Sequence, residues 1–207
     1  MAPSIDDLTP PRYELLAELT HAELADFVLH YFFRRRSWVI WAHHGMSAAT
    51  VAAIVVVAIG EGRSLLRCLG DFGLAFVALF VVILPLHELL HAAGYRLVGA
   101  RDIRWDYSLR MLAVWVIAHR FVAETRAFLV VALAPFVVLN AALIAGAFAF
   151  PQFAVPLLFV LLWHLHGSIG DWALLNFVWL HRARGFWTYD DAAAGKSYFF
   201  GVTSDEC

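Results

Sequence analysis

Residues 127–170 form the longest stretch of the chain without Asp, Glu, Lys or Arg. A helix of about 20 apolar residues is enough to cross a bilayer, so this stretch is too long for a single crossing. Pro151 and Gln152 divide it into two candidate spans, 127–150 and 153–180. A chain of this kind must place much of its length in lipid as helices, because helices satisfy their own backbone hydrogen bonds there.

Two further stretches are long and apolar in the same way. Residues 37–60 have no Asp, Glu, Lys or Arg, and residues 72–95 have a single acid. The 207 residues are 62% hydrophobic and 15% charged, whereas soluble domains are near half apolar and a quarter charged. A soluble fold of this size could not bury that excess. The sequence therefore predicts an all-α membrane protein with about four transmembrane helices.

The segment 103–122, between the second and third predicted spans, has an apolar centre too short to cross a membrane. Its β-branched and aromatic residues favour a hairpin, although a re-entrant helix also fits. The sequence thus divides into a cytoplasmic N-terminal segment with an amphipathic helix (1–36), a transmembrane domain (37–183) and a cytoplasmic tail (184–207). The opening residues are acidic and proline-containing, unlike a signal peptide.

Basic residues are concentrated on one side of the predicted membrane. They precede the first span, lie between the second and third, and follow the fourth, whereas the opposite side carries only Arg63 and Arg67. The positive-inside rule then places both termini in the cytoplasm, and we expect an integral protein of the plasma membrane. The net charge of -2 and the lack of a basic stripe argue against a nucleic-acid partner.

The second predicted span contains the motif HExxH, formed by His87, Glu88 and His91. On a helix, residues four apart share one face, so two imidazoles with this spacing can bind one zinc ion. Glu88 falls beside them, where a carboxylate can take a proton from zinc-bound water. Ionisable residues within membrane spans are rare and usually functional.

Glu88 and Asp171 are the only acids in the four predicted spans, and no Lys or Arg lies in the core of a span to pair with them. Burying an unpaired carboxylate in a bilayer costs at least about 2.5 kcal/mol. A divalent metal held by His87, His91 and Asp171 would supply the missing positive charge. His91 and Asp171 both lie toward the cytoplasmic ends of their spans, so they can meet. This donor set suits zinc best.

The run 86–94, then Leu133-Ala134-Pro135, then 167–171, resembles a family of membrane zincin peptidases. That family is similar in plan to the site-2 proteases, which are intramembrane zinc metalloproteases. The resemblance covers most of residues 70–195. It implies that His87, His91 and Asp171 bind zinc. Site-2 proteases usually carry their aspartate before a glycine, whereas here Asp171 follows Gly170.

Two other polar residues are candidates for a substrate or oxyanion role. His166 is five residues from Asp171 and could approach the metal, or it could be an interhelical histidine with its hydrogen bonds satisfied. Asn140 lies in the third predicted span, and site-2 proteases use an Asn in a comparable place for substrate handling. A hydrogen bond that joins two helices explains Asn140 equally well.

These features together predict an intramembrane zinc metallopeptidase that hydrolyses peptide bonds in membrane-associated protein or peptide substrates, with Glu88 as general base. Two alternatives remain open at this point. The first is a membrane scaffold that keeps a metal without catalysis, although structural zinc sites normally have four protein ligands. The second is a transporter or redox protein that uses buried histidines. Paired haem ligands would normally come from two helices, whereas HExxH places both on one.

Overall fold

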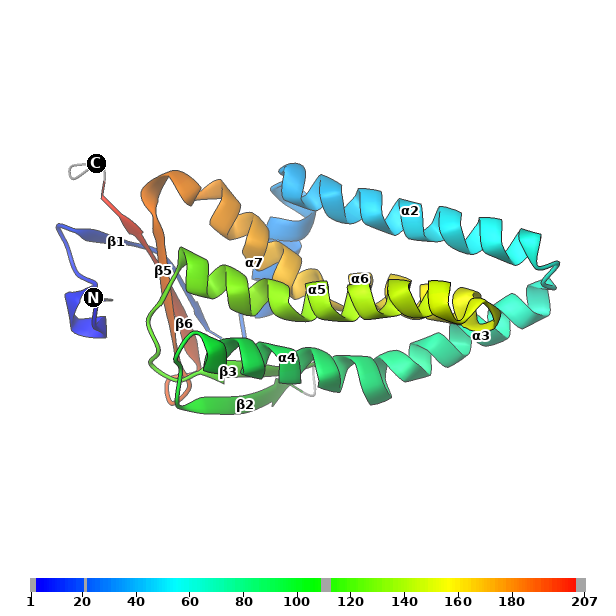
Figure 1. Ribbon diagram of the computed structural model, residues 1–207. Coiled ribbons are helices and arrows are strands. Elements are labelled where there is room, and N and C mark those ends of the chain that lie inside the picture. Colours follow the sequence, from blue (N-terminus) through cyan, green and yellow to red (C-terminus); the bar gives the residue numbers. More distant parts are fainter. Residues whose placement is uncertain (1–2, 21, 109–112, 204–207) are drawn as a thin grey trace.

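The computed structural model describes residues 3–20, 22–108 and 113–203. Figure 1 shows long helices lying side by side, with a small sheet across one end of the bundle. Both ends of the chain lie at that sheet. The turn between α2 and α3 lies at the opposite end.

Three helices among the described residues are long and apolar enough to cross a membrane. The first is α2, Trp38–Gly60, and the third is α5, Thr125–Ala149. The second, Leu65–Leu97, consists of α3 (Leu65–Ala78), a π-helical turn and α4 (Leu84–Leu97). Large apolar side chains on their outer faces stay exposed, as lipid-facing residues do. The predicted membrane protein is confirmed at this level.

The fourth predicted span is a bent pair of helices. α6 (Ala154–Gly167) and α7 (Ile169–Leu180) meet at an angle of 52°. At the bend, the backbone N–H and the hydroxyl of Ser168 both donate to the carbonyl of His164, at 3.1 and 2.8 Å. Gly167 and Gly170, one on each side of the bend, have no side chains that would crowd it. The pair makes a fourth span only if it is counted as one broken helix.

The second span begins seven residues earlier than the predicted 72–95 and therefore contains an additional acid, Asp71. The expectation that Glu88 and Asp171 are the only acids in the spans was wrong for this reason. Asp71 accepts a hydrogen bond from the Arg63 guanidinium at 2.5 Å, so its charge is paired close to the end of the bundle.

The chain is not purely α-helical, which corrects the predicted fold class. A four-stranded antiparallel sheet has the order β1-β6-β5-β4, with bounds Tyr13–Thr20, Lys196–Val202, Phe186–Asp191 and Ala123–Glu124. The pairing of β1, at one edge of the sheet, with β6 joins the N-terminal segment to the tail, for example Tyr13 with Val202. Periodicity within either short segment carries no signal for a partner so distant in the chain.

The predicted N-terminal helix is present as α1 (Leu24–Val28), continued by a π-helical stretch (Leu29–Arg34). Its apolar face packs on α7, where the rings of Phe27 and Phe177 are 5.5 Å apart. Asn176 of α7 stabilises the end of the π-helical stretch, because its amide donates to the carbonyls of Tyr31 and Arg35.

The element between the second and third spans is a hairpin. Of the two predicted alternatives, a hairpin and a re-entrant helix, the first is therefore correct. β2 (Ile103–Ser108) pairs antiparallel with β3 (Ala113–Ala118), while the turn at 109–112 lies outside the described residues. Residues Val116, Ile117 and Ala118 are buried. β3 lies against α4, the helix that carries HExxH.

Candidate metal centre

The HExxH motif lies on α4, immediately after the π-helical turn Leu79–Ile83. Pro85 is at the start of α4 and has no N–H to donate to the carbonyl of Val81, four residues earlier. The wider π turn accommodates that missing bond, and such turns are frequent at functional sites.

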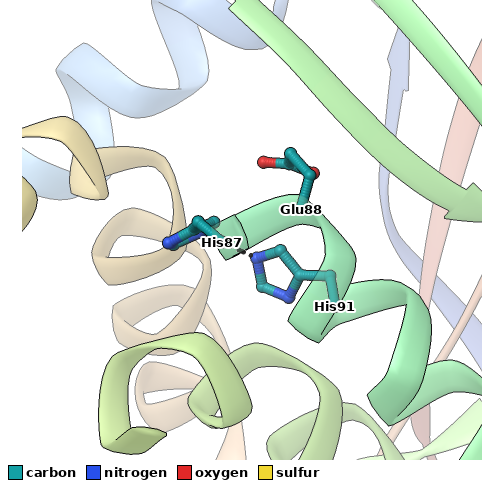
Figure 2. Close-up of side chains that lie close together, drawn as sticks. All are labelled: His87, Glu88 and His91. Carbon is teal, nitrogen blue, oxygen red and sulfur yellow. Dashed lines mark hydrogen bonds between the residues drawn. The ribbon is translucent and has the colours of Figure 1, made fainter. Parts of the chain in front are cut away.

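Figure 2 shows His87, Glu88 and His91 projecting from α4, with the two imidazoles in contact and the carboxylate of Glu88 to one side. One potential ligand atom from each residue lies within 4.8 Å of the others. Both histidines are buried, at 4% and 9% exposure. The helical spacing expected from the sequence therefore produces a compact, buried cluster.

The bend between α6 and α7 brings Asp171 to these histidines. Asp171 lies in the first turn of α7, where the helix dipole favours a negative charge. Its Oδ2 atom is 3.0 Å from His87 Nε2, and its Oδ1 atom is 3.4 Å from His91 Nε2. A straight helix through this region would direct Asp171 elsewhere, so the bend is what assembles the site.

The spacing of these atoms fits a zinc ion. The Nε2 atoms of His87 and His91 lie 3.0 Å apart, and Asp171 completes the triangle. Tetrahedral ligands about 2.0–2.1 Å from zinc stand about 3.3 Å from one another. The three side chains thus offer donor atoms at about the separations of zinc ligands, with one Asp171 oxygen near each histidine. A catalytic zinc keeps its fourth position for water or substrate.

The other nitrogen of each ring makes a hydrogen bond away from the cluster. His91 Nδ1 donates to the backbone carbonyl of Val131 at 2.9 Å. His87 Nδ1 donates to Nε2 of His164, a fully buried residue of α6, at 3.0 Å. A neutral imidazole has one N–H, so both Nε2 atoms present lone pairs toward Asp171. Three electron-rich groups converge at about 3 Å, an arrangement that a metal cation stabilises.

Glu88 is bound by the neighbouring hairpin. Its Oε2 atom accepts a hydrogen bond of 3.0 Å from the backbone N–H of Val116 in β3. This contact holds the carboxylate next to the histidines without placing it between them.

A family model described as "Putative zincin peptidase" matches residues 80–184. The chain belongs to this family. The matched residues contain HExxH, the hairpin, the bend and Asp171, so the family assignment and the geometry concern the same part of the chain. No curated protein and no solved structure matches the chain.

In this member of the zincin peptidase family, the two candidates for a substrate or oxyanion role, His166 and Asn140, lie in different surroundings from each other. His166 is exposed, and its Nδ1 donates to the carbonyl of Leu162 in its own helix at 2.8 Å. Its ring lies beside His43, 5.6 Å away, rather than beside the HExxH pair. Asn140 is buried, and its Oδ1 accepts a hydrogen bond from His164 Nδ1 at 2.7 Å.

His164 contacts His87 directly, a contact that the sequence does not predict. Of the two histidines that precede Asp171, His166 is the nearer along the chain, and the sequence therefore favours His166. Helical geometry gives the available signal, because residues 164 and 166 point to different faces of α6. The packing of α6 against α5 and the Leu79–Ile83 turn then decides which face meets the motif.

Proposed function

We propose that this protein is an intramembrane zinc metallopeptidase that hydrolyses peptide bonds of membrane-associated protein or peptide substrates. One observation carries the proposal. The Nε2 atoms of His87 and His91 and the carboxylate of Asp171 converge at 3.0–3.4 Å, on helices apolar enough to cross a membrane. Membership of the zincin peptidase family supports the same chemistry.

The three converging side chains would hold the metal. A bound zinc ion supplies Lewis acidity, which polarises the scissile carbonyl and lowers the pKa of water toward neutrality. Glu88 accepts a proton from the attacking water and later delivers that proton to the leaving amine. Its hydrogen bond to Val116 keeps the carboxylate in place for both transfers.

A substrate in extended conformation would bind along β3. This strand pairs with β2 through one edge, while the N–H of Val116 points the opposite way, toward Glu88. A peptide that adds to this second edge would bring its backbone next to the base and the histidines. Hydrolysis in a membrane requires an unwound substrate, because a helical peptide bond is enclosed by its own hydrogen bonds.

The sheet end of the bundle would face the cytoplasm, with both termini there, in the plasma membrane. The arginine distribution supports this orientation. At that end, the rings of Trp38 and Trp179 are 5.0 Å apart, and the Arg182 guanidinium lies 4.0 Å from the Trp179 ring. Tryptophan and arginine together are typical of the membrane–water interface. Residues 37–183 would then form the catalytic domain, between the N-terminal segment 1–36 and the tail 184–207.

The first test is zinc content, measured by elemental analysis on detergent-purified wild type, Glu88→Gln and Asp171→Ala. We expect about one zinc per chain in wild type and Glu88→Gln, because Glu88 is a base rather than a ligand, and loss of zinc in Asp171→Ala. Freshly purified wild type without stoichiometric zinc would refute the peptidase proposal.

Turnover is tested with a pool of single-span transmembrane peptides reconstituted with the protein and analysed by mass spectrometry. Cleavage by wild type and none by Glu88→Gln would support catalysis. Zinc retention together with equal peptide patterns for both proteins would instead support a metal-binding scaffold. An absorbance spectrum of the pure protein tests the redox alternative, since a zinc site has no haem absorption band.

A further inference from the structure

Helix α5 contains a proline one turn beyond the carbonyl that His91 uses. In an uninterrupted helix, the N–H of residue 135 would donate to the carbonyl of residue 131. Pro135 has no N–H, so the carbonyl of Val131 has no helical partner there. His91 Nδ1 donates to this same carbonyl at 2.9 Å. The proline therefore leaves free the acceptor that orients the second histidine of HExxH.

Close packing of α4 on α5 makes this bond possible. Gly94, three residues after His91, faces α5, and a β-carbon placed on it would be 3.1 Å from the Cα of Val131. Glycine allows the two backbones to approach closely, as small residues do between membrane helices. The ring of His91 can thus reach a main-chain atom of the neighbouring helix.

The same helix also orients the first histidine, through one intermediary. Asn140 lies on α5, and its Oδ1 atom accepts the hydrogen bond from His164 Nδ1 at 2.7 Å. With its proton on Nδ1, His164 offers Nε2 as the acceptor for His87 Nδ1, at 3.0 Å. His87 is then left with its Nε2 lone pair facing Asp171.

We propose that α5 is the positioning helix of the metal centre, and that Pro135 and Asn140 are its positioning residues. Pro135 acts through the Val131 carbonyl on His91, and Asn140 acts through His164 on His87. Each directs a Nε2 lone pair to the place where the metal binds. The inference rests on the proposed function, since it assigns those lone pairs to zinc. Groups that orient metal-binding histidines in this way typically change metal affinity about 10–100-fold when removed.

The test for Pro135 is the substitution Pro135→Ala, which restores an N–H that competes with His91 for the Val131 carbonyl. We expect zinc affinity, measured by competition with a chelator, to fall about 10–100-fold, while thermal stability stays equal or rises, because alanine favours helix. The matched control is Pro156→Ala. Pro156 lies in the first turn of α6, and the carbonyl four residues before it, that of Gln152, accepts a hydrogen bond from Arg63 rather than from a histidine of the motif.

The test for Asn140 uses Asn140→Leu, which keeps the size of the side chain and removes the acceptor. His164→Leu should weaken zinc binding similarly, and His164→Gln should restore much of the affinity, because a Gln oxygen can accept from His87 Nδ1. His166→Leu is the control two residues away, since the Nδ1 hydrogen bond of His166 goes to Leu162 in its own helix. The absorption spectrum of the cobalt-substituted protein reports altered coordination in the same variants.

Zinc affinities of Pro135→Ala and Asn140→Leu equal to wild type would overturn the inference while leaving the proposed function intact. Wild type that binds no zinc would refute the proposed function, and the inference is then decided by ring 15N chemical shifts of the metal-free protein. A proton on His91 Nδ1 in wild type that is redistributed in Pro135→Ala would support the positioning role. Identical shifts in the two proteins would refute it.

Discussion

Gly94 of α4 lies against Val131 of α5 so closely that a β-carbon on Gly94 would meet the Cα of Val131 at 3.1 Å. This is a close approach of one helix backbone to another, so a side chain at position 94 would force the two helices apart. The distance between HExxH and the carbonyl that orients His91 depends on it.

We therefore predict that Gly94→Ala separates α4 from α5. Overpacking of this kind costs about 1–3 kcal/mol, and zinc affinity should fall as the His91–Val131 bond lengthens. Thermal unfolding in detergent and zinc competition measure the two effects. Gly73→Ala in α3 is the matched control, because nothing lies within 4 Å of a β-carbon there. Equal losses of stability and zinc affinity in both variants would mean that the contact between Gly94 and Val131 does not position the site.

Glu88→Gln should abolish hydrolysis while the fold and zinc content persist. Glutamine retains an oxygen that can accept the Val116 N–H, but it cannot take up a proton, so the rate should fall by about 10²–10⁴-fold. Glu14→Gln is the control, since its ion pair with Arg184 is exposed and such pairs contribute little. A Glu88→Gln protein that cleaves peptides at the wild-type rate would remove Glu88 from the mechanism.

Val116→Pro tests the hydrogen bond between β3 and Glu88. The substitution removes the N–H donor and should lower turnover on the order of 10–100-fold, because a base displaced by about 1 Å loses efficiency steeply. Zinc content should not change. Val114→Pro, two residues earlier on the same strand and exposed, is the control. If Val114→Pro is as slow as Val116→Pro, strand pairing with the substrate rather than the contact with Glu88 explains the loss.

Arg63 joins two turns at the end of the bundle far from the sheet. It donates to Glu61, to Asp71 at 2.5 Å and to the carbonyl of Gln152 at 3.0 Å, and its side chain is only 4% exposed. Arg63→Ala leaves Asp71 without this partner, and we expect a loss of about 1–3 kcal/mol in thermal unfolding, with zinc affinity unchanged. The exposed Arg67 provides the control variant. If Arg63→Ala is as stable as Arg67→Ala, the hydrogen bonds of Arg63 do not stabilise this end of the bundle.

The sequence alone determined the helical membrane-protein class, because long uncharged apolar stretches have few other stable solutions. It also determined the pairing of His87 with His91, since residues four apart on a helix share a face whatever surrounds them. These are local properties, and they were readable from neighbouring residues.

Only the tertiary structure decided how distant groups meet those local elements. The charge balance of the spans predicts Asp171 near the histidines, and the bend at Ser168 decides how it reaches them. The packing of α6 against α5 made His164 rather than His166 the partner of His87. The pairing of Tyr13 with Val202 likewise closed a sheet that neither segment signals by itself. Such contacts depend on helix bends, crossing distances and strand partners far apart in the chain, and local periodicity contains no information about them.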